Sequence, residues 1–223
     1  MRVILFGPTG MLGQSVLREC VLDPDVETVL AMVRRAGSLA DASGKVRELV
    51  VEDFYNYSSV QAQLAGCDAC FFCLGVSVVG LKEPEYRHIT YDLTKAAAFA
   101  VLGANPGRLT FEYVSAAGTN PNSRQMWARV KGETENALFA MGFRAAYAFR
   151  PGLIVPLHGI RSKTAVYQRT YDVLRPLLPL LLRLFPKHIV TTEMVGKAML
   201  RTAKSGYSKK ILESADIATV GRA

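Results

Sequence analysis

The chain has 223 residues, of which 50% are hydrophobic and 21% are charged, and its formal net charge is +8. These values are ordinary for a globular protein, and the length is enough for one well-buried domain. The lysines and arginines are scattered, without a basic stripe interleaved with aromatic residues, so we expect no nucleic-acid partner.

The N-terminus has none of the features of a targeting segment. Met1 and Arg2 lead directly into a short apolar run, without the longer apolar stretch and small-residue cleavage site of a signal peptide. The four cysteines are few for this length, which suits a reducing compartment. We therefore expect a cytoplasmic location.

The hydrophobic pattern predicts strands and helices in regular alternation over the first two thirds of the chain. The predicted strands are residues 2–6, 28–33, 47–51, 67–74, 109–114 and 144–149. The predicted helices are residues 11–21, 58–64, 84–102 and 125–141. Because the loops between them are short, this α/β pattern predicts a doubly wound parallel sheet that is covered by helices on both faces.

Beyond Pro151 the alternation changes. We expect a strand at 188–190, a helix at 192–203 and a further strand at 210–213, with residues 152–190 forming a small C-terminal cap on a single domain of residues 1–223. Residues 164–185 are rich in proline and leucine and are a candidate contact for a second copy or another protein. The most apolar window, 174–185, is interrupted by arginines and prolines and falls short of the ~20 residues that span a bilayer. We expect no stable membrane insertion, and interfacial contact is the alternative.

Three glycines stand where the first strand passes into the first helix. Gly7 suits a tight turn, Gly10 lets the backbone approach a pyrophosphate, and Gly13 allows close packing of the helix on the sheet. The N–H groups and the dipole at the helix N-terminus favour phosphate. The pattern therefore predicts a dinucleotide-binding Rossmann unit. Its expected pyrophosphate contacts are Gly7, Thr9, Gly10, Met11, Leu12 and Gly13.

The second strand ends in two basic residues, Arg34 and Arg35, where an NAD site usually has an acidic residue for the ribose hydroxyls. Guanidinium groups suit a 2′-phosphate, so we predict NADP(H) as the cofactor, with NAD as the alternative. For Arg35 a solvated position is the competing interpretation. Asp53, after the third strand, suits either the adenine amino group or the capping of its own loop.

Later motifs extend this pattern. Leu74-Gly75 follows the fourth strand, Ser115 follows the fifth, Lys131 lies in the helix over 125–141, and Arg150-Pro151-Gly152 follows the sixth strand. Together with the glycine motif, they resemble the atypical and extended branch of the short-chain dehydrogenase/reductase superfamily, which includes the Tat-interacting-protein group and the NAD-dependent epimerases and dehydratases.

The resemblance implies a role for each of these residues. It places Leu74, Gly75 and Arg150-Pro151-Gly152 beside the nicotinamide end of the cofactor. It implies that Ser115 polarises a substrate oxygen and that Lys131 binds the cofactor ribose. Capping of a turn by Ser115 and an exposed helix position for Lys131 are the competing interpretations. The function implied is an oxidoreductase or epimerase-like enzyme acting on a small carbonyl or sugar-type substrate.

One position departs from the family. The tyrosine that acts as general acid/base stands four residues before the lysine, and here that position is Trp127. An indole N–H donates a hydrogen bond but does not exchange a proton at neutral pH. Two hypotheses follow: an NADP(H)-dependent enzyme, or a cofactor-binding sensor or interaction protein without turnover. Trp127 as a packing residue that covers the site is compatible with both.

Other motifs add little. Cys67, Cys70 and Cys73 form a C-x-x-C-x-x-C run, but no fourth ligand follows, and we interpret them as small buried hydrophobic residues rather than a metal site. A G-x-S-x-G nucleophile motif is absent from the sequence, which argues against a hydrolase.

Overall fold

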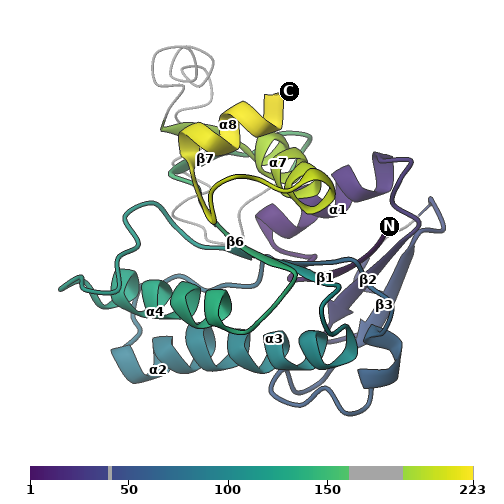
Figure 1. Cartoon of the computed structure of the whole chain (residues 1–223), viewed down its shortest axis with the longest axis horizontal. Helices are drawn as coiled ribbons and strands as arrows, with labels where there is room; N and C mark the ends of the chain where they lie inside the picture. The colour runs from purple at the N-terminus through teal and green to yellow at the C-terminus, as the bar shows by residue number, and fades with distance from the viewer. Residues whose placement is uncertain (40–41, 161–187, 223) are drawn as a thin grey trace.

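The computed structural model describes residues 1–39, 42–160 and 188–222 (Figure 1). In this part of the chain, seven strands form a parallel sheet in the order β3-β2-β1-β4-β5-β6-β9. They are β1 (Arg2–Phe6), β2 (Thr28–Val33), β3 (Val46–Val50), β4 (Ala69–Phe72), β5 (Thr110–Val114), β6 (Ala145–Arg150) and β9 (Ile211–Glu213). The strand order reverses between β1 and β4, and ligands of doubly wound sheets bind at this point, outside the carboxyl ends of the strands.

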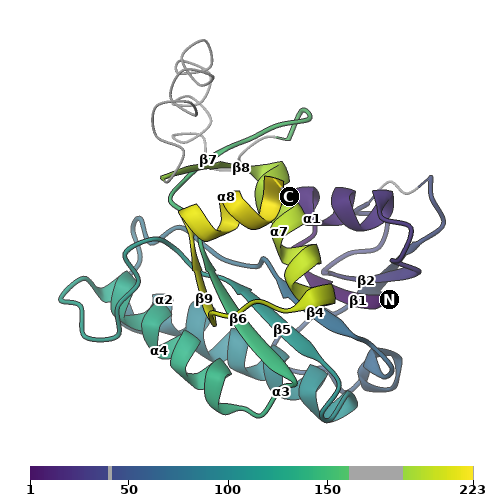
Figure 2. The same ribbon diagram turned by 45° about the horizontal axis from the view of Figure 1, so that its top comes forward.

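Helices cover both faces of the sheet. One layer consists of α1 (Met11–Leu22), α7 (Thr192–Ser205) and α8 (Ser214–Arg222), and the other of α2 (Glu83–Arg87), α3 (Leu93–Ala104) and α4 (Met126–Ala140) (Figures 1 and 2). Successive residues of a strand point to opposite faces, so Val3 and Leu5 of β1 pack in the α1/α7 core, whereas Ile4 and Phe6 pack in the α3/α4 core. The predicted doubly wound α/β sheet is confirmed.

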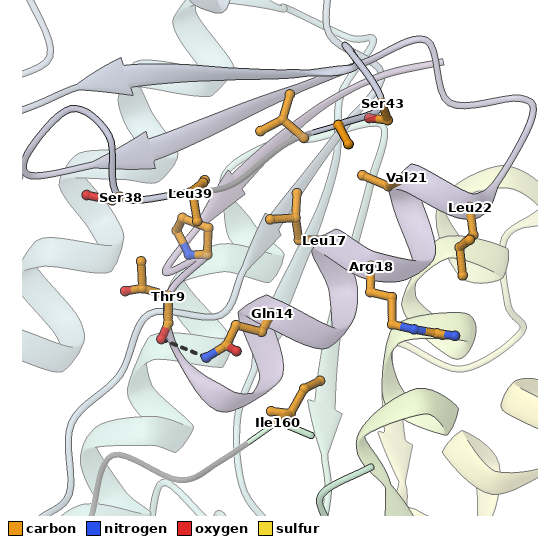
Figure 3. A pocket seen from close by; sticks show the side chains of 13 residues that line it. Thr9, Gln14, Leu17, Arg18, Val21, Leu22, Ser38, Leu39, Ser43 and Ile160 are labelled. Atoms are coloured by element: carbon orange, nitrogen blue, oxygen red, sulfur yellow. Dashed lines mark hydrogen bonds between the residues drawn. The ribbon is translucent and has the colours of Figure 1, made fainter. Parts of the chain in front are cut away.

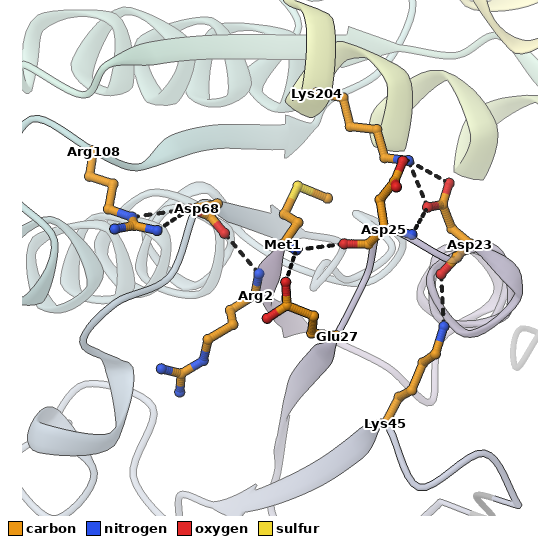
Figure 4. A network of polar contacts seen from close by, with 9 residues as sticks. All are labelled: Met1, Arg2, Asp23, Asp25, Glu27, Lys45, Asp68, Arg108 and Lys204. Atoms are coloured by element: carbon orange, nitrogen blue, oxygen red, sulfur yellow. Dashed lines mark hydrogen bonds and ion pairs between the residues drawn. The ribbon is translucent and has the colours of Figure 1, made fainter.

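Polar contacts hold the amino ends of the strands (Figure 4). Asp68, just before β4, accepts a hydrogen bond from the backbone N–H of Arg2 at 2.8 Å. Lys204 of α7 donates to the carboxylates of Asp23 and Asp25, both at 2.6 Å, and so joins α7 to the segment between α1 and β2. These contacts lie at the amino ends of the strands, whereas a ligand of this sheet would bind at the opposite edge, at the carboxyl ends.

Several predicted elements differ in extent. The helix predicted at 58–64 is wrong, since only a short 3₁₀ helix, η1 (Gln61–Leu64), forms there. Its turns are closed by bonds between residues three apart, such as Gln63 N–H to the Val60 carbonyl at 2.9 Å, and seven residues are too few to stabilise an α-helix by themselves. The helix predicted at 84–102 is confirmed as α2 and α3, which are joined by a π-helical turn at His88–Asp92.

The C-terminal part contains elements that the sequence did not predict. These are helix α8, which follows β9 directly, and strand β7 (Leu153–Val155). Strand β8 (Ile189–Thr191) confirms the strand predicted at 188–190, and it pairs in parallel with β7 as a second, two-stranded sheet. Residues 161–187, which include the predicted contact segment 164–185, lie outside the described residues. Within the described ranges, we find no helix with the length and apolar character needed to cross a bilayer.

Candidate cofactor and substrate site

The turn between β1 and α1 requires glycine at two positions. Gly7 has a φ of +75°, and a Cβ there would lie 2.9 Å from the backbone nitrogen of Leu74. A Cβ on Gly13 would lie 1.9 Å from the Gly7 carbonyl oxygen, so the first turn of α1 packs directly on the turn before it. A Cβ on Gly10 would approach only that same oxygen, at 3.3 Å, which leaves the outer side of Gly10 open to a ligand.

The N-terminus of α1 has the electrostatics of an anion site. Gly10 is the N-cap residue and provides no side-chain cap, and the first turn contains no acidic residue. The first N–H groups of a helix have no partner within it, and the helix dipole adds positive potential at this end. The side-chain amide of Gln14 donates to the Thr9 carbonyl at 3.1 Å and braces the loop. This arrangement fits a pyrophosphate.

A cavity of about 310 Å³ continues from the glycine turn towards the end of β2. Arg34 and Arg35 line it and are exposed, so both guanidinium groups are accessible to an anion. The Arg34 guanidinium lies over the Phe54 ring, 5.8 Å from its centroid. Leu74 also lines the cavity. The full lining is Gly7, Pro8, Thr9, Met32, Val33, Arg34, Arg35, Ser38, Phe54 and Leu74.

Five of the cofactor residues named from the sequence belong to this lining: Gly7, Thr9, Arg34, Arg35 and Leu74. The others lie outside it, and Asp53 and Gly75 are among them. Asp53 caps its own turn, since its carboxylate accepts from the backbone N–H of Tyr55 at 2.9 Å. Gly75 is exposed just beyond Leu74. The lining residues that were not predicted are Pro8, Met32, Val33, Ser38 and Phe54. For Phe54, an aromatic residue a few positions after the third strand is a signal that could have been used.

A larger cavity of about 1020 Å³ lies on the other side of Thr9, between α1 and the segment before β3 (Figure 3). Apolar side chains dominate its wall, among them Leu17, Val21, Leu39 and Ile160. This cavity could not be predicted from the sequence, because its wall comes from three segments that are distant from one another in the chain.

Ser115 lies directly after β5, where backbone bonds extend the pairing with β6. Its N–H donates to the Phe149 carbonyl at 2.7 Å. The Ser115 Oγ lies 3.1 Å from Thr119 Oγ1, and Thr119 Oγ1 donates to the Ala116 carbonyl at 2.8 Å. Because a hydroxyl has one proton, Ser115 must be the donor in the bond to Thr119. The Ser115 proton therefore points towards Thr119, and the lone pairs of the Ser115 Oγ remain able to accept a hydrogen bond from another donor.

Lys131 of α4 is partly buried behind the same loop. Its Nζ donates to Tyr113 Oη at 3.3 Å and to the Val114 carbonyl at 3.4 Å, and it lies 5.0 Å from the centroid of the Tyr113 ring. Burial lowers the pKa of Lys131 to about 8, against the opposing effect of the Glu135 carboxylate. This side chain is not an exposed helix lysine, and its ammonium is held at the end of β5.

Trp127 lies one turn before Lys131 on α4 and faces the same loop. A Cβ on Gly118 would lie 3.5 Å from Trp127 Cη2, so the indole packs over the segment that follows Ser115. The residue is half-buried. Trp127 therefore covers this end of the site.

The turn after β6 acts through its backbone. Arg150 is engaged elsewhere, because its guanidinium binds the Glu135 carboxylate (Nε to Oε1, 3.0 Å) and Glu213 (3.1 Å) and so joins α4, β6 and β9. The Pro151 carbonyl accepts from Ala117 N–H at 3.1 Å. The Gly152 N–H donates to Ser214 Oγ at 2.7 Å.

Beside this turn is a cavity of about 650 Å³, lined by Ala117, Gly152, Leu153, His188, Ile189, Glu213, Ser214 and Ala215.

The cysteine run belongs to the core. Cys67 and Cys70 are fully buried and Cys73 is half-buried, and burial raises the pKa of the Cys67 thiol to about 11. Across the described ranges, no three His, Cys, Asp or Glu side chains come together as a metal site.

The glycine turn and the cavity beside it are the hallmarks of a nicotinamide-dinucleotide site, and comparison with protein-family models agrees. The model described as NAD(P)H-binding matches residues 7–147. This chain belongs to the NAD(P)H-binding family. Its fold resembles that of Gre2 from Candida albicans, solved in complex with NADPH, with a TM-score of 0.72, 15% identity, and coverage of 96% of this chain and 78% of that one.

Two fungal relatives are similar over much of this NAD(P)H-binding chain. Protein FMP52, mitochondrial, of Saccharomyces cerevisiae is 30% identical over 74% of this chain and 69% of its own length. Protein fmp52-1, mitochondrial, of Aspergillus terreus is 32% identical over 68% of this chain and 66% of its own length. Because both are named as mitochondrial, the cytoplasmic location predicted from the sequence is wrong. Cysteine content separates oxidising from reducing compartments and does not say which reducing compartment holds a protein.

Proposed function

We propose that this chain is an NADP(H)-dependent reductase that acts on a small carbonyl compound. The observation that carries the proposal is the cavity beside the glycine turn, in which Arg34 and Arg35 present two accessible guanidinium groups at the end of β2. Such groups suit a dianionic 2′-phosphate, whereas NAD has a hydroxyl at that position. When bound, the cofactor supplies a hydride.

The residues at the carboxyl ends of β5 and β6 are proposed to serve the other end of the cofactor. The Lys131 ammonium, held at the end of β5, is near enough to the sheet edge to bind the cofactor ribose. Ser115 orients the substrate oxygen if its hydroxyl turns away from Thr119. The cavity that begins at Ala117 and Gly152 has room for a small substrate.

Calorimetric titration of the purified protein with NADPH and with NADH tests the cofactor assignment. We expect NADPH to bind at least about 10-fold more tightly, since a charge-assisted hydrogen bond contributes ~1.5–3 kcal/mol. Equal affinity for the two would refute the role of the arginines. Absence of binding by either would refute the proposed function as a whole.

A second candidate function is cofactor binding without turnover, as in a sensor or interaction protein. Trp127 favours it, because the indole stands where a proton-exchanging side chain is needed. The variant Trp127→Tyr separates the two functions, with Trp127→Phe as the control that keeps an aromatic ring but has no hydroxyl. Carbonyl reduction by the wild type would exclude the second candidate, whereas reduction only by Trp127→Tyr would support it.

A further inference from the structure

The connection between β2 and β3 lacks the helix that such a connection usually contains. Crossovers between parallel strands are right-handed, so this connection passes over the same face of the sheet as α1. Its described residues, 34–39 and 42–45, form only turns, bends and irregular backbone. On this side α1 therefore has no neighbouring helix, and the cavity of about 1020 Å³ lies there instead (Figure 3).

The wall of this cavity is apolar along the length of α1. Leu17 and Val21 are half-buried, and Leu22, at the end of the helix, is 61% exposed. Leu39 of the β2–β3 connection and Ile160 also line the cavity. Contact of such a wall with water costs free energy, and the volume is at the upper end of the ~300–1,000 Å³ that ligand pockets have. The wall therefore favours an apolar occupant.

The wall carries no net charge. Arg18 is the one charged residue among the described residues that line the cavity, and its Nη1 binds the Oε1 of Glu19 at 2.5 Å. Glu19 is buried, so its carboxylate already neutralises this guanidinium. A charged group inside the cavity would lose its hydration without gaining an unpaired partner of opposite charge. The charge pattern therefore favours an uncharged ligand.

Polar groups lie at the end of the cavity next to the glycine turn. They belong to Thr9, Gln14 and Ser38, and Thr9 and Ser38 also line the cofactor cavity (Figure 3). The Gln14 amide donates one N–H to the Thr9 carbonyl and has a second N–H and an oxygen for another partner. Apart from Ser43, the lining towards the far end of α1 is apolar or belongs to the Arg18–Glu19 pair.

The length of the apolar wall sets the length of the ligand. From Gln14 to Leu22 helix α1 rises by about 12 Å, at ~1.5 Å per residue. An extended chain advances about 3.5 Å over three bonds, so ~12 Å corresponds to about ten bonds.

We propose that this cavity binds an unbranched alkyl chain of about ten carbons with an uncharged hydroxyl or carbonyl head. The chain lies along α1 over Leu17 and Val21, and the head binds the Gln14 amide at the end next to the glycine turn. The site is separate from the proposed reductase function, because it binds a ligand and makes or breaks no bond.

A series of alcohols tests the proposal. In calorimetry, the whole chain is titrated without NADPH into 1-hexanol, 1-octanol, 1-decanol and 1-dodecanol, each below its solubility limit. We expect saturable binding that tightens ~3- to 4-fold for each methylene up to ten carbons, and no further gain for 1-dodecanol. Decanoate and decyltrimethylammonium should bind at least about 10-fold more weakly than 1-decanol.

Two variants and a control locate the site. Leu39→Ser, in the wall, should weaken 1-decanol binding about 10-fold. Leu22→Ser changes an exposed side chain at the far end, so it should remove the gain from 1-octanol to 1-decanol and leave 1-hexanol unchanged. Leu153→Ser, in the wall of the 650 Å³ cavity, should leave all affinities within about 2-fold. Circular dichroism checks that each variant is folded.

Several results would overturn the proposal. They are absence of saturable binding, affinity that does not depend on chain length, and binding of decanoate as tight as that of 1-decanol. Wild-type affinities in both Leu39→Ser and Leu22→Ser would also overturn it, as would equal losses in Leu153→Ser. Absence of NADPH binding would instead refute the proposed function and leave the alkyl site as it stands.

Discussion

The two ends of the candidate site differ in the groups that they offer to a ligand. At the β1–α1 end, the groups offered to a ligand are backbone amides, positioned by glycines that have no side chain to titrate or rotate. At the β5–α4 end, the groups are side chains, and most of their polar atoms already bind one another: Ser115 binds Thr119, and Lys131 binds Tyr113. Cofactor binding therefore depends on local backbone geometry, whereas any chemistry depends on contacts between distant segments.

The largest expected effect on stability and cofactor binding comes from adding one methyl group at the β1–α1 turn. In Gly13→Ala, the new Cβ would lie 1.9 Å from the Gly7 carbonyl oxygen, and a backbone atom cannot rotate away. We expect the free energy of unfolding to fall by about 3 kcal/mol, at the upper end of overpacking costs, and NADPH binding to be lost. Urea unfolding measures the free energy of unfolding, and calorimetry at a temperature below the unfolding transition measures NADPH binding.

The control is the same substitution at a helix position that has room. A Cβ on Gly103 of α3 would lie 3.8 Å from its nearest neighbour, so Gly103→Ala should be neutral or stabilise by up to ~1 kcal/mol. If both variants behave alike, the close approach at Gly13 does not control the site.

The backbone end could be predicted from the sequence because its cause is local. The positive φ of Gly7 and the close approach of Gly13 to the Gly7 carbonyl are set within seven residues, and the strand–glycine–helix order shows where they act. The approach of Leu74 to Gly7 is the one contact of this turn that the local sequence does not show. The strands were predictable for a similar reason, since a run such as Val3–Phe6, buried on both faces, is continuously apolar. Helix α8 was missed because it follows a three-residue strand, β9, without any intervening turn signal.

The second prediction concerns a carboxyl in the middle of β5. Glu112 is fully buried, and neither oxygen has a hydrogen-bond partner among the described residues. Burial raises the pKa of Glu112 well above its usual value, so the native state binds its proton more tightly than the unfolded state. Its contribution to stability is therefore greatest below the unfolded pKa of about 4.3 and is lost as the pH rises towards the native pKa.

Glu112→Gln removes this titration while keeping the shape of the side chain. We expect the unfolding free energy of the variant, relative to wild type, to rise with pH, by up to about 1.4 kcal/mol per pH unit, from the unfolded pKa of about 4.3 towards the native pKa. Glu112→Met, an apolar residue of similar size, should show the same slope with a different offset. Denaturant unfolding at several pH values measures it, and a difference that does not change with pH would contradict the burial of a neutral carboxyl.

The third prediction returns to the cofactor end and tests the exposed arginines. Arg34→Ala removes the guanidinium that lies over Phe54, and NADPH affinity should fall roughly 10- to 30-fold, or about 1.5–2 kcal/mol, while NADH affinity changes little. Arg47→Ala, on the exposed side of β3, is the control for net charge. Equal losses from both variants would mean that Arg34 acts only through the overall charge of the protein.

For the β5–α4 end, the sequence predicts which residues are involved but not the contacts that they make. The sequence located Ser115, Lys131 and Trp127, but the direction of the Ser115 proton depends on Thr119, and the environment of Lys131 depends on Tyr113, a residue on another element. Arg150 shows the same limit, since its partner Glu135 is distant in sequence. Such pairings are set by tertiary packing and leave no periodic or local pattern.

The smallest expected effects compare one tyrosine hydroxyl from each end. Tyr113 Oη accepts from Lys131 Nζ at 3.3 Å, so Tyr113→Phe leaves an ammonium donor without that partner and should lower the unfolding free energy by about 1 kcal/mol. Tyr57 packs edge-on against Phe6 near the cofactor end, and its buried hydroxyl has no partner among the described residues. Tyr57→Phe should therefore be neutral or stabilise by up to ~1 kcal/mol.

Urea unfolding of both variants in the same buffer measures the difference in their free energies of unfolding. If Tyr113→Phe were as stable as Tyr57→Phe, the bond to Lys131 would contribute nothing, and the lysine would be held by the aromatic ring and the Val114 carbonyl alone.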